Sequence, residues 1–133
     1  MCGFVGYYST KNNLGEIIPD KLKEASRLIS HRGPDEETYY VSRDFHVAFR
    51  RLSIQDINKG SQPFKSKSGK YILVLNGEIY NHLELRETYL KDIEFYSTSD
   101  AETIVELIDK FGVEKTIPLL NGMFSITSLE TRL

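Results

Sequence analysis

The only cysteine of the sequence stands at position 2, directly behind the initiator methionine. A small second residue such as cysteine permits removal of Met1, and Cys2 would then carry both a thiol and a free α-amine. An α-amine has a reference pKa of about 7.7–8.0 and can take a proton from the thiol beside it near neutral pH. A nucleophile activated by its own terminal amine is an established catalytic arrangement. Cys2 is therefore a candidate nucleophile; the alternative is a small side chain that only packs.

A second candidate is the dipeptide Asn76-Gly77, which directly follows the apolar run 71–75. Such a run is typical of a strand that is buried on both faces. A side-chain amide and a backbone N–H at the end of a rigid strand can stabilise an oxyanion, because both donors are fixed before the charge develops. The same dipeptide is also favoured in tight hairpin turns, and an ordinary turn is the alternative interpretation.

Charged side chains are available to bind the two ends of an amino acid. Arg50 and Arg51 are neighbours in a predicted strand, whose alternation directs them to opposite faces. A guanidinium can form a planar, bidentate pair with a carboxylate. Asp100 and Glu78 are candidate partners for an ammonium group, although Asp100 at a helix start also suits the helix dipole by itself.

Composition restricts the class of protein. The chain has 133 residues, of which 40% are apolar and 27% charged, as in an ordinary globular domain. A net charge of −2 with scattered signs gives no indication of nucleic-acid or membrane-surface binding. One cysteine, no visible signal peptide and no apolar run of membrane length predict a cytoplasmic protein. The three histidines lie far apart, so we expect no metal site and no cofactor.

Periodicity and turn signals predict the elements that position these residues. Strands are expected at 3–8, 38–42, 46–52, 71–75 and 123–127, the second and third forming a hairpin. Helices are expected from Pro19 to before His31, from about 80 to 91, and from Ser99 to Gly112, where Ser99 and Glu102 fit a capping box. The first helix has Leu22, Ala25, Leu28 and Ile29 as its apolar positions, and segments 9–15 and 56–69 are expected to be loops. This pattern predicts an α+β fold with antiparallel sheet.

Five short strings occur in a fixed order along the chain. They are Met1-Cys2-Gly3, His31-Arg32-Gly33-Pro34-Asp35, Arg51-Leu52-Ser53-Ile54, Asn76-Gly77-Glu78-Ile79-Tyr80-Asn81 and Ser99-Asp100-Ala101-Glu102. Together they resemble the N-terminal glutaminase domain of asparagine-synthetase-like class II glutamine amidotransferases, from the first residue to about Phe124. The resemblance implies an N-terminal-nucleophile hydrolase fold, which is a four-layer α/β/β/α sandwich of antiparallel sheets.

The resemblance also implies a reaction, the hydrolysis of glutamine to glutamate and ammonia through a thioester on Cys2. Asn76 and Gly77 would form the oxyanion site, and Arg51 would bind the α-carboxylate of glutamine. The remaining residues implied to bind glutamine are Asp100 and Glu78, together with Leu52, Ser53, Ile54 and Gln55, which would line the pocket through backbone groups.

Three alternatives stay open at this point. His31, with Asp35, is a rival base for Cys2 in the manner of a cysteine protease, although the resemblance implies a structural loop there. The sugar-phosphate and phosphoribosyl amidotransferases are related branches, but they carry a different string around the arginine clamp. The chain would otherwise be a non-catalytic remnant that binds glutamine or a partner protein.

The resemblance does not extend to a second domain. Members of this family usually carry a synthetase domain that activates an acceptor with ATP, and no phosphate-binding glycine-rich loop of that domain is visible here. We therefore expect one amidotransferase domain over 1–133, with glutamine and a separate synthetase domain or chain as partners and an acceptor that the sequence does not specify. Residues 128–133 fit the family's continuation poorly, which predicts a domain incomplete at its C-terminus. An open sheet edge would then favour self-association.

Overall fold

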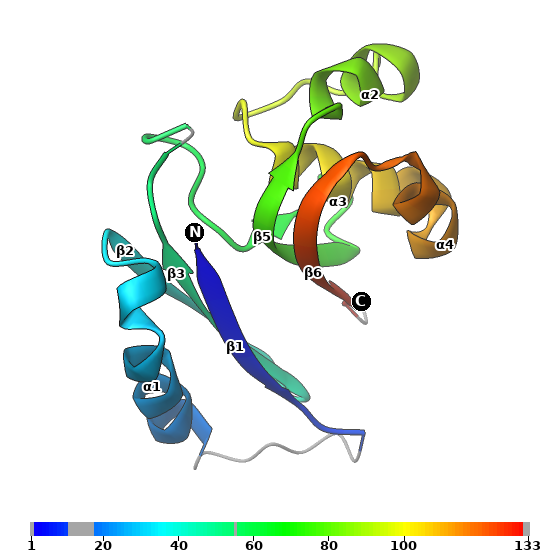
Figure 1. Cartoon of the computed structure of the whole chain (residues 1–133). Coiled ribbons are helices and arrows are strands. Elements are labelled where there is room, and N and C mark those ends of the chain that lie inside the picture. Colours follow the sequence, from blue (N-terminus) through cyan, green and yellow to red (C-terminus); the bar gives the residue numbers. More distant parts are fainter. Residues whose placement is uncertain (1, 11–17, 55, 132–133) are drawn as a thin grey trace. The chain divides into compact units, whose positions relative to one another are not determined.

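The computed structural model describes residues 2–10, 18–54 and 56–131 (Figure 1). It divides into two compact units, Met1–Ile54 and Gln55–Leu133, and each is described by itself. In the described part of the chain, no helix has the length and apolar character needed to cross a membrane.

The first unit is a three-stranded antiparallel sheet with one helix. Its strands are β1 (Gly3–Tyr8), β2 (Glu36–Val41) and β3 (Phe45–Arg51), in the order β1-β3-β2. Helix α1 (Ile18–Leu28) packs along β3 and β1, and a 3-10 turn, Ser30–Arg32, follows it (Figure 1). The predicted first strand and the predicted hairpin are thus confirmed. The predicted loop 9–15 lies largely outside the described residues.

Helix α1 confirms the predicted helix but not all of its apolar positions. Leu22 and Ser26 are fully buried, one helical turn apart, whereas Leu28 is 76% exposed. Leu28 follows Leu22 by six residues and therefore lies on a different face of a helix with 3.6 residues per turn. The prediction that Leu28 faces the core is therefore wrong.

Strand β3 has two faces with different neighbours. Arg50 donates hydrogen bonds to Ser26 of α1, so the alternate positions Arg50, Ala48 and His46 face the helix. The other face carries Phe45, Val47, Phe49 and Arg51, and all four side chains are buried. The strand thus ends with one arginine on each face, as predicted.

The second unit contains the other antiparallel sheet. Strands β4 (Phe64–Lys65), β5 (Tyr71–Ile79) and β6 (Gly122–Glu130) are arranged in the order β4-β5-β6. The short strand β4 lies within the predicted loop 56–69, and β6 extends the strand predicted at 123–127. The helices are α2 (His82–Tyr89), α3 (Asp100–Phe111) and α4 (Val113–Thr116), with a 3-10 turn at Ile117–Leu119.

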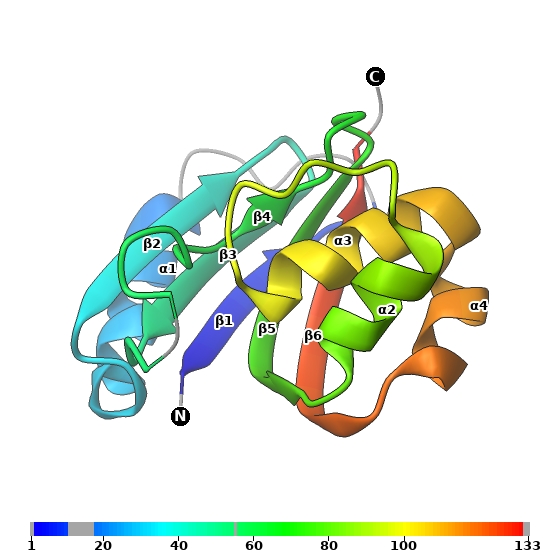
Figure 2. The same ribbon diagram turned by 90° about the horizontal axis from the view of Figure 1, so that it is seen from above.

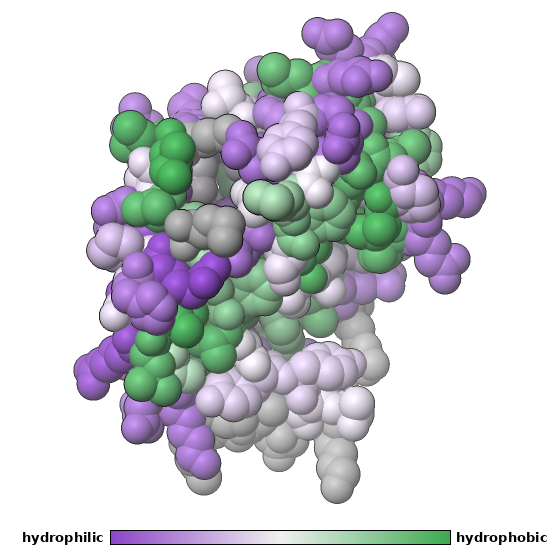
Figure 3. Space-filling view, in the orientation of Figure 1, coloured by the Kyte–Doolittle hydropathy of each residue, from purple (hydrophilic) through white to green (hydrophobic). Residues whose placement is uncertain are grey.

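Helix α3 packs on β5, and α2 packs on α3 (Figure 2). The core between them contains Leu73 and Leu75 of the sheet and Ile104, Leu107 and Ile108 of the helix. Ile72 and Val74, on the other face of β5, are also buried, which confirms that this strand is buried on both faces. The viewed surface carries hydrophobic as well as hydrophilic side chains (Figure 3).

The ends of α3 agree with the sequence except in one detail. Ser99 is the N-cap and accepts a hydrogen bond from the N–H of Ala101, and Gly112 is the C-cap. The capping box is wrong, because the carboxylate of Glu102 accepts from the N–H groups of Tyr96 and Ser97 instead of that of Ser99. Glu102 therefore stabilises the turn before the helix rather than the cap itself.

Candidate functional site

In the first unit, Cys2 lies against the backbone at the end of β3. The N–H of Leu52 donates to the Cys2 Sγ at 3.3 Å, and the thiol lies 3.7 Å from the Leu52 carbonyl oxygen. This contact follows from the register, in which Gly3 pairs with Arg50. An N–H group directed at sulfur stabilises negative charge there, which is the charge that a thiolate nucleophile carries.

Arg32 holds the backbone of the same cysteine. Its Nε donates to the Cys2 carbonyl oxygen at 3.0 Å. His31 is exposed, whereas Cys2 makes its polar contacts with Leu52 and Arg32 among the described residues. Sequence reasoning gave Arg32 no role, and the only available signal was its place inside the string 31–35.

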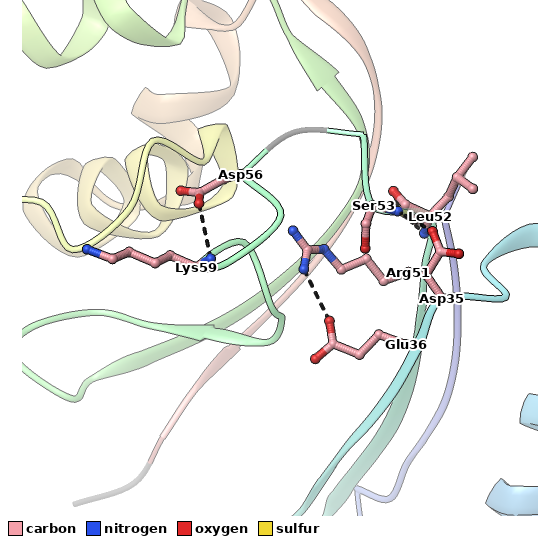
Figure 4. Close-up of polar contacts among 8 residues, drawn as sticks. Asp35, Glu36, Arg51, Leu52, Ser53, Asp56 and Lys59 are labelled. Atoms are coloured by element: carbon pink, nitrogen blue, oxygen red, sulfur yellow. Dashed lines mark hydrogen bonds and ion pairs between the residues drawn. The ribbon is translucent and has the colours of Figure 1, made fainter.

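That string forms a loop packed against the end of β3. A Cβ on Gly33 would lie 2.3 Å from the Arg50 carbonyl carbon, so only glycine fits this approach. The Asp35 carboxylate accepts from the N–H of Ser53 at 2.7 Å, and the Asp35 N–H donates to the Arg51 carbonyl oxygen (Figure 4). The loop thereby fixes the segment that the sequence predicts to line a pocket.

Arg51 is buried, and its Nη1 forms an ion pair with the Glu36 carboxylate at 3.3 Å (Figure 4). Residues paired across neighbouring strands share a face. Gly3 pairs with Arg50, so Cys2 and Arg51, one step along each strand, lie on the opposite face from Arg50. The candidate nucleophile and the candidate carboxylate clamp are therefore neighbours on the face of the sheet away from α1.

Arg50 has a structural environment instead. It forms an ion pair of 2.8 Å with Glu37, which also accepts hydrogen bonds from Ser26 and Tyr39. Burial by itself would raise the pKa of Glu37, but the hydrogen bonds from Ser26 and Tyr39 and the charge of Arg50 outweigh it and lower this pKa below its ordinary value. This network ties α1 to β2 and β3.

In the second unit, Asn76-Gly77 lies inside β5 and not at its end. Asn76 pairs with Ser125 of β6, and Gly77 pairs with Phe124. The expectation that the strand ends at Leu75 and the alternative of a hairpin turn are both wrong. Gly77 allows the strand to continue because its φ is +145° and a Cβ there would lie 2.1 Å from the Met123 carbonyl oxygen.

Asn76 itself carries an unsatisfied polar atom. Its Oδ1 is buried and has no hydrogen-bond partner within the described part of the chain. By strand alternation, Asn76 lies on the same face of β5 as Ile72 and Val74, away from α3. Buried polar groups without a partner are rare in folded proteins, and a role in ligand binding or catalysis is one explanation of them.

Asp100 is the first residue of α3, and its carboxylate links that helix to β5. One oxygen accepts from the N–H of Ile79 at 2.9 Å, and the other accepts from the N–H of Ala101 at 2.8 Å. Burial raises the pKa of Asp100, and these hydrogen bonds counteract only part of that rise. The side chain thus lies just beyond Gly77 and Glu78, and Glu78 is exposed.

Asp56 is a residue of this unit that sequence reasoning missed. Its Oδ2 accepts from the N–H and hydroxyl of Thr98 at 2.6 and 3.1 Å. Its Oδ1 accepts from the N–H of Lys59 at 3.0 Å (Figure 4). The hydrogen bond from the Thr98 backbone lowers the pKa of Asp56. Asp56 therefore anchors the turn that precedes Asp100, and its only sequence signal was its place two residues after Ile54.

Other predicted positions are accounted for as follows. Leu52 and Ser53 lie at the end of β3 as described, and Ile54 is 74% exposed. Met1 and Gln55 lie outside the described residues. Among residues 2–10, 18–54 and 56–131, no group of three or more His, Cys, Asp or Glu side chains is placed to hold a metal ion.

Comparison with known proteins gives consistent similarities. The family model of a glutamine amidotransferase domain matches residues 1–132. The chain is 40% identical over 125 residues to the glutamine-hydrolyzing asparagine synthetase B of Escherichia coli (strain K12), covering 94% of this chain and 22% of that protein. It is 40% identical over 127 residues to the glutamine-hydrolyzing asparagine synthetase 2 of Bacillus subtilis (strain 168), covering 95% of this chain and 17% of that protein. It is 36% identical over 132 residues to the glutamine-hydrolyzing asparagine synthetase 1 of Arabidopsis thaliana, covering 99% of this chain and 22% of that protein. The chain thus spans about a fifth of the length of these relatives.

Proposed function

Because the chain belongs to the glutamine amidotransferase domain family, we propose that it hydrolyses glutamine and supplies the ammonia to a synthetase activity. The family membership confirms the resemblance of the five sequence strings. The observation that carries the proposal is the position of the Cys2 thiol against the Leu52 N–H, on the same sheet face as Arg51.

The proposed chemistry begins after removal of Met1. The Cys2 sulfur attacks the side-chain carbonyl carbon of glutamine while the Cys2 α-amine accepts the thiol proton. The amine then gives this proton to the leaving nitrogen, and ammonia departs as the thioester forms. Water adds to the thioester, glutamate leaves, and the thiol is restored.

In the first unit, Arg51 would bind the α-carboxylate of glutamine. Its burial supports this role, because a guanidinium held away from water gains more from a charged ligand than an exposed one. Leu52, Ser53, Ile54 and Gln55 would contribute backbone groups, and the Asp35 bond to Ser53 supports a fixed conformation there.

In the second unit, Asn76 and the Gly77 N–H would stabilise the oxyanion, and Asp100 with Glu78 would bind the substrate's ammonium group. The donor of Asn76 would be its Nδ2; the buried Oδ1 is an acceptor without a partner among the described residues, which supports a side chain available to a ligand. Each oxygen of the Asp100 carboxylate accepts one N–H bond, from Ile79 or Ala101, and keeps a lone pair that can accept from the ammonium group of the substrate.

We also propose that the two sheets belong to a four-layer α/β/β/α sandwich. Each sheet carries buried apolar residues on the face away from its helix, Val47 and Phe49 in one and Ile72 and Val74 in the other. A second sheet is the usual cover for such a face.

The relatives named above are asparagine synthetases, and the chain spans a fifth of their length. The ammonia would therefore pass to an ATP-dependent synthetase domain or chain, with aspartate as the first acceptor to test. Strand β6 is at the edge of its sheet among the described strands, and pairing of that edge would give a homo-oligomer that sedimentation can detect.

The test is intact mass before and after incubation with a glutamine analogue that carries a diazoketone in place of the amide. The expected result is a chain without Met1 that gains one adduct, blocked by excess glutamine and missing in Cys2→Ala. A Cys2→Ala variant that still releases glutamate would refute the mechanism. Glutamine binding without adduct or turnover would favour the alternative of a non-catalytic binding module.

A further inference from the structure

The turn that leads into Asp100 is held by one side chain of α2. Arg86 donates from Nη1 to the Ser97 carbonyl oxygen at 2.9 Å and from Nη2 to the Ser99 carbonyl oxygen at 2.7 Å. Its Nε donates to the Thr103 hydroxyl at 2.6 Å. The guanidinium therefore binds the chain on both sides of Asp100.

The geometry of these bonds bears directly on Asp100. The Ser99 carbonyl and the Asp100 nitrogen belong to one planar peptide group, so fixing the oxygen fixes the direction in which the Asp100 backbone leaves that group. Thr103 lies one helical turn later, where its position sets the axis of the first turn of α3. The carboxylate of Asp100 then reaches the N–H of Ile79.

The guanidinium is itself held in one orientation. Its central carbon lies 3.7 Å from the centre of the Phe95 ring, which stacks against its flat face. The plane of the guanidinium is thereby set, and its three donors reach three acceptors at once. A lysine in this place keeps the charge but has no planar fork, so it cannot make the three bonds together.

We propose that Arg86 is a positioning residue for Asp100 and thereby sets the selectivity for a substrate with an α-ammonium group. The inference rests on the proposed role of Asp100 in binding that group. Misplacement of a group by about 1 Å can cost on the order of 100-fold, so a small shift of the turn should have a measurable effect on kcat/KM for glutamine.

The experiment compares glutamine with the monoamide of glutaric acid, which is glutamine without its α-amino group. Glutamate or glutarate release is measured for the wild type, Arg86→Lys, Asp100→Asn and the double variant. Lys110→Ala is the matched control, because Lys110 also joins α3 to α2 through a backbone carbonyl, that of Tyr89, but is remote from the turn. Thr103→Val serves as a milder variant; it removes the Nε acceptor and the 3.5 Å hydrogen bond from the Thr103 hydroxyl to the Ser99 carbonyl oxygen but keeps both Nη bonds of Arg86.

We expect Asp100→Asn to abolish the preference for glutamine. In Arg86→Lys, KM for glutamine rises about tenfold or more with little change in kcat, KM for the monoamide stays constant, and the preference falls. Thr103→Val moves the preference in the same direction by less. The double variant has the same preference as Asp100→Asn alone, because both substitutions act on the same interaction with the ammonium group. Lys110→Ala keeps the wild-type preference.

The failures of the two ideas are distinct. If Asp100→Asn keeps the preference, Asp100 does not bind the ammonium group, and that part of the proposed function is wrong. If Asp100→Asn loses it while Arg86→Lys and Thr103→Val keep it, or lose activity equally on both substrates, the role of Arg86 is refuted. Amide hydrogen exchange gives a readout without turnover: exchange at Ile79 should be faster in Arg86→Lys than in Lys110→Ala, and equal rates would overturn the inference.

Discussion

The Sγ of Cys2 accepts a hydrogen bond from the backbone N–H of Leu52, at 3.3 Å. Leu52 directly follows Arg51, so the candidate nucleophile Cys2 is hydrogen-bonded to the neighbour of the candidate carboxylate clamp. A displacement of this part of β3 would move both groups together. The distance between the thiol and the guanidinium is therefore governed by strand pairing rather than by a flexible loop.

The two adjacent arginines give a test with a built-in control. Arg51→Lys should raise KM for glutamine roughly 10–100-fold, because a lysine cannot form the bidentate pair with a carboxylate. Arg50→Lys should leave KM unchanged and lower the free energy of unfolding by about 1–3 kcal/mol, because it disturbs the bonds to Glu37 and Ser26. Steady-state kinetics and urea unfolding measure the two effects. An equal rise of KM in both variants would contradict the division of roles.

Asn76→Ala should reduce kcat about 100–1,000-fold, as expected for the loss of one oxyanion donor. Stability should change little, because the Oδ1 of Asn76 has no partner among the described residues that the substitution would leave unpaired. Kinetics and thermal unfolding of the same preparation decide the point. A large loss of stability with unchanged kcat would assign Asn76 to packing instead.

Gly77→Ala should destabilise the second unit by about 3 kcal/mol or more, because a Cβ would meet the Met123 carbonyl oxygen in addition to the strain of a positive φ. Gly69→Ala is the matched variant, since Gly69 has a φ of +80° but only the flexible Lys65 side chain near its Cβ position. We expect a loss of about 1 kcal/mol there. If urea unfolding gives similar losses of stability for both variants, the close approach of β6 to Gly77 does not account for the need for glycine there.

The pKa of Asp100 is raised above its ordinary value of 3.8 by burial. Between that value and the raised one, the folded chain binds more protons than the unfolded chain. The stabilising contribution of Asp100 is thus complete below 3.8 and is lost as pH rises through the raised pKa. Urea unfolding across acid pH should therefore show the wild type losing stability relative to Asp100→Asn as pH rises.

Asp56 should behave in the opposite way. Its pKa is lowered, first of all by the hydrogen bond from the Thr98 backbone, so its contribution is present above the ordinary value of 3.8 and is lost as pH falls through the lowered pKa. Relative to Asp56→Asn, the wild type should gain stability as pH rises. Slopes of the same sign for the two aspartates would contradict the environments described.

Local signals in the sequence were sufficient for most elements. The aromatic and β-branched run after Cys2 indicated β1, and Ser99 and Gly112 marked the ends of α3. The separation of Arg50 from Arg51 followed from strand alternation alone. These features depend on residues close together in the chain, which is why periodicity and capping rules identified them.

Features that depend on distant partners were not predictable in this way. Local preference places Asn-Gly in a hairpin turn, and only the pairing with β6 decides that Gly77 continues β5. The contacts of Arg32 with Cys2 and of Asp56 with Thr98 join residues 30 and 42 positions apart. Nothing in the sequence near either residue indicates its partner.

The ion pairs of the first sheet also favour one register of its strands. Glu36 stands opposite Arg51 and Glu37 opposite Arg50, so two ion pairs form only when β2 and β3 are in this register. A one-residue slip of β3 would keep at most one pair, would turn Arg51 toward α1 and would place Arg50 on the other face. Two adjacent arginines can therefore have different roles in one protein, because a wrong register of the strands would lose ion pairs.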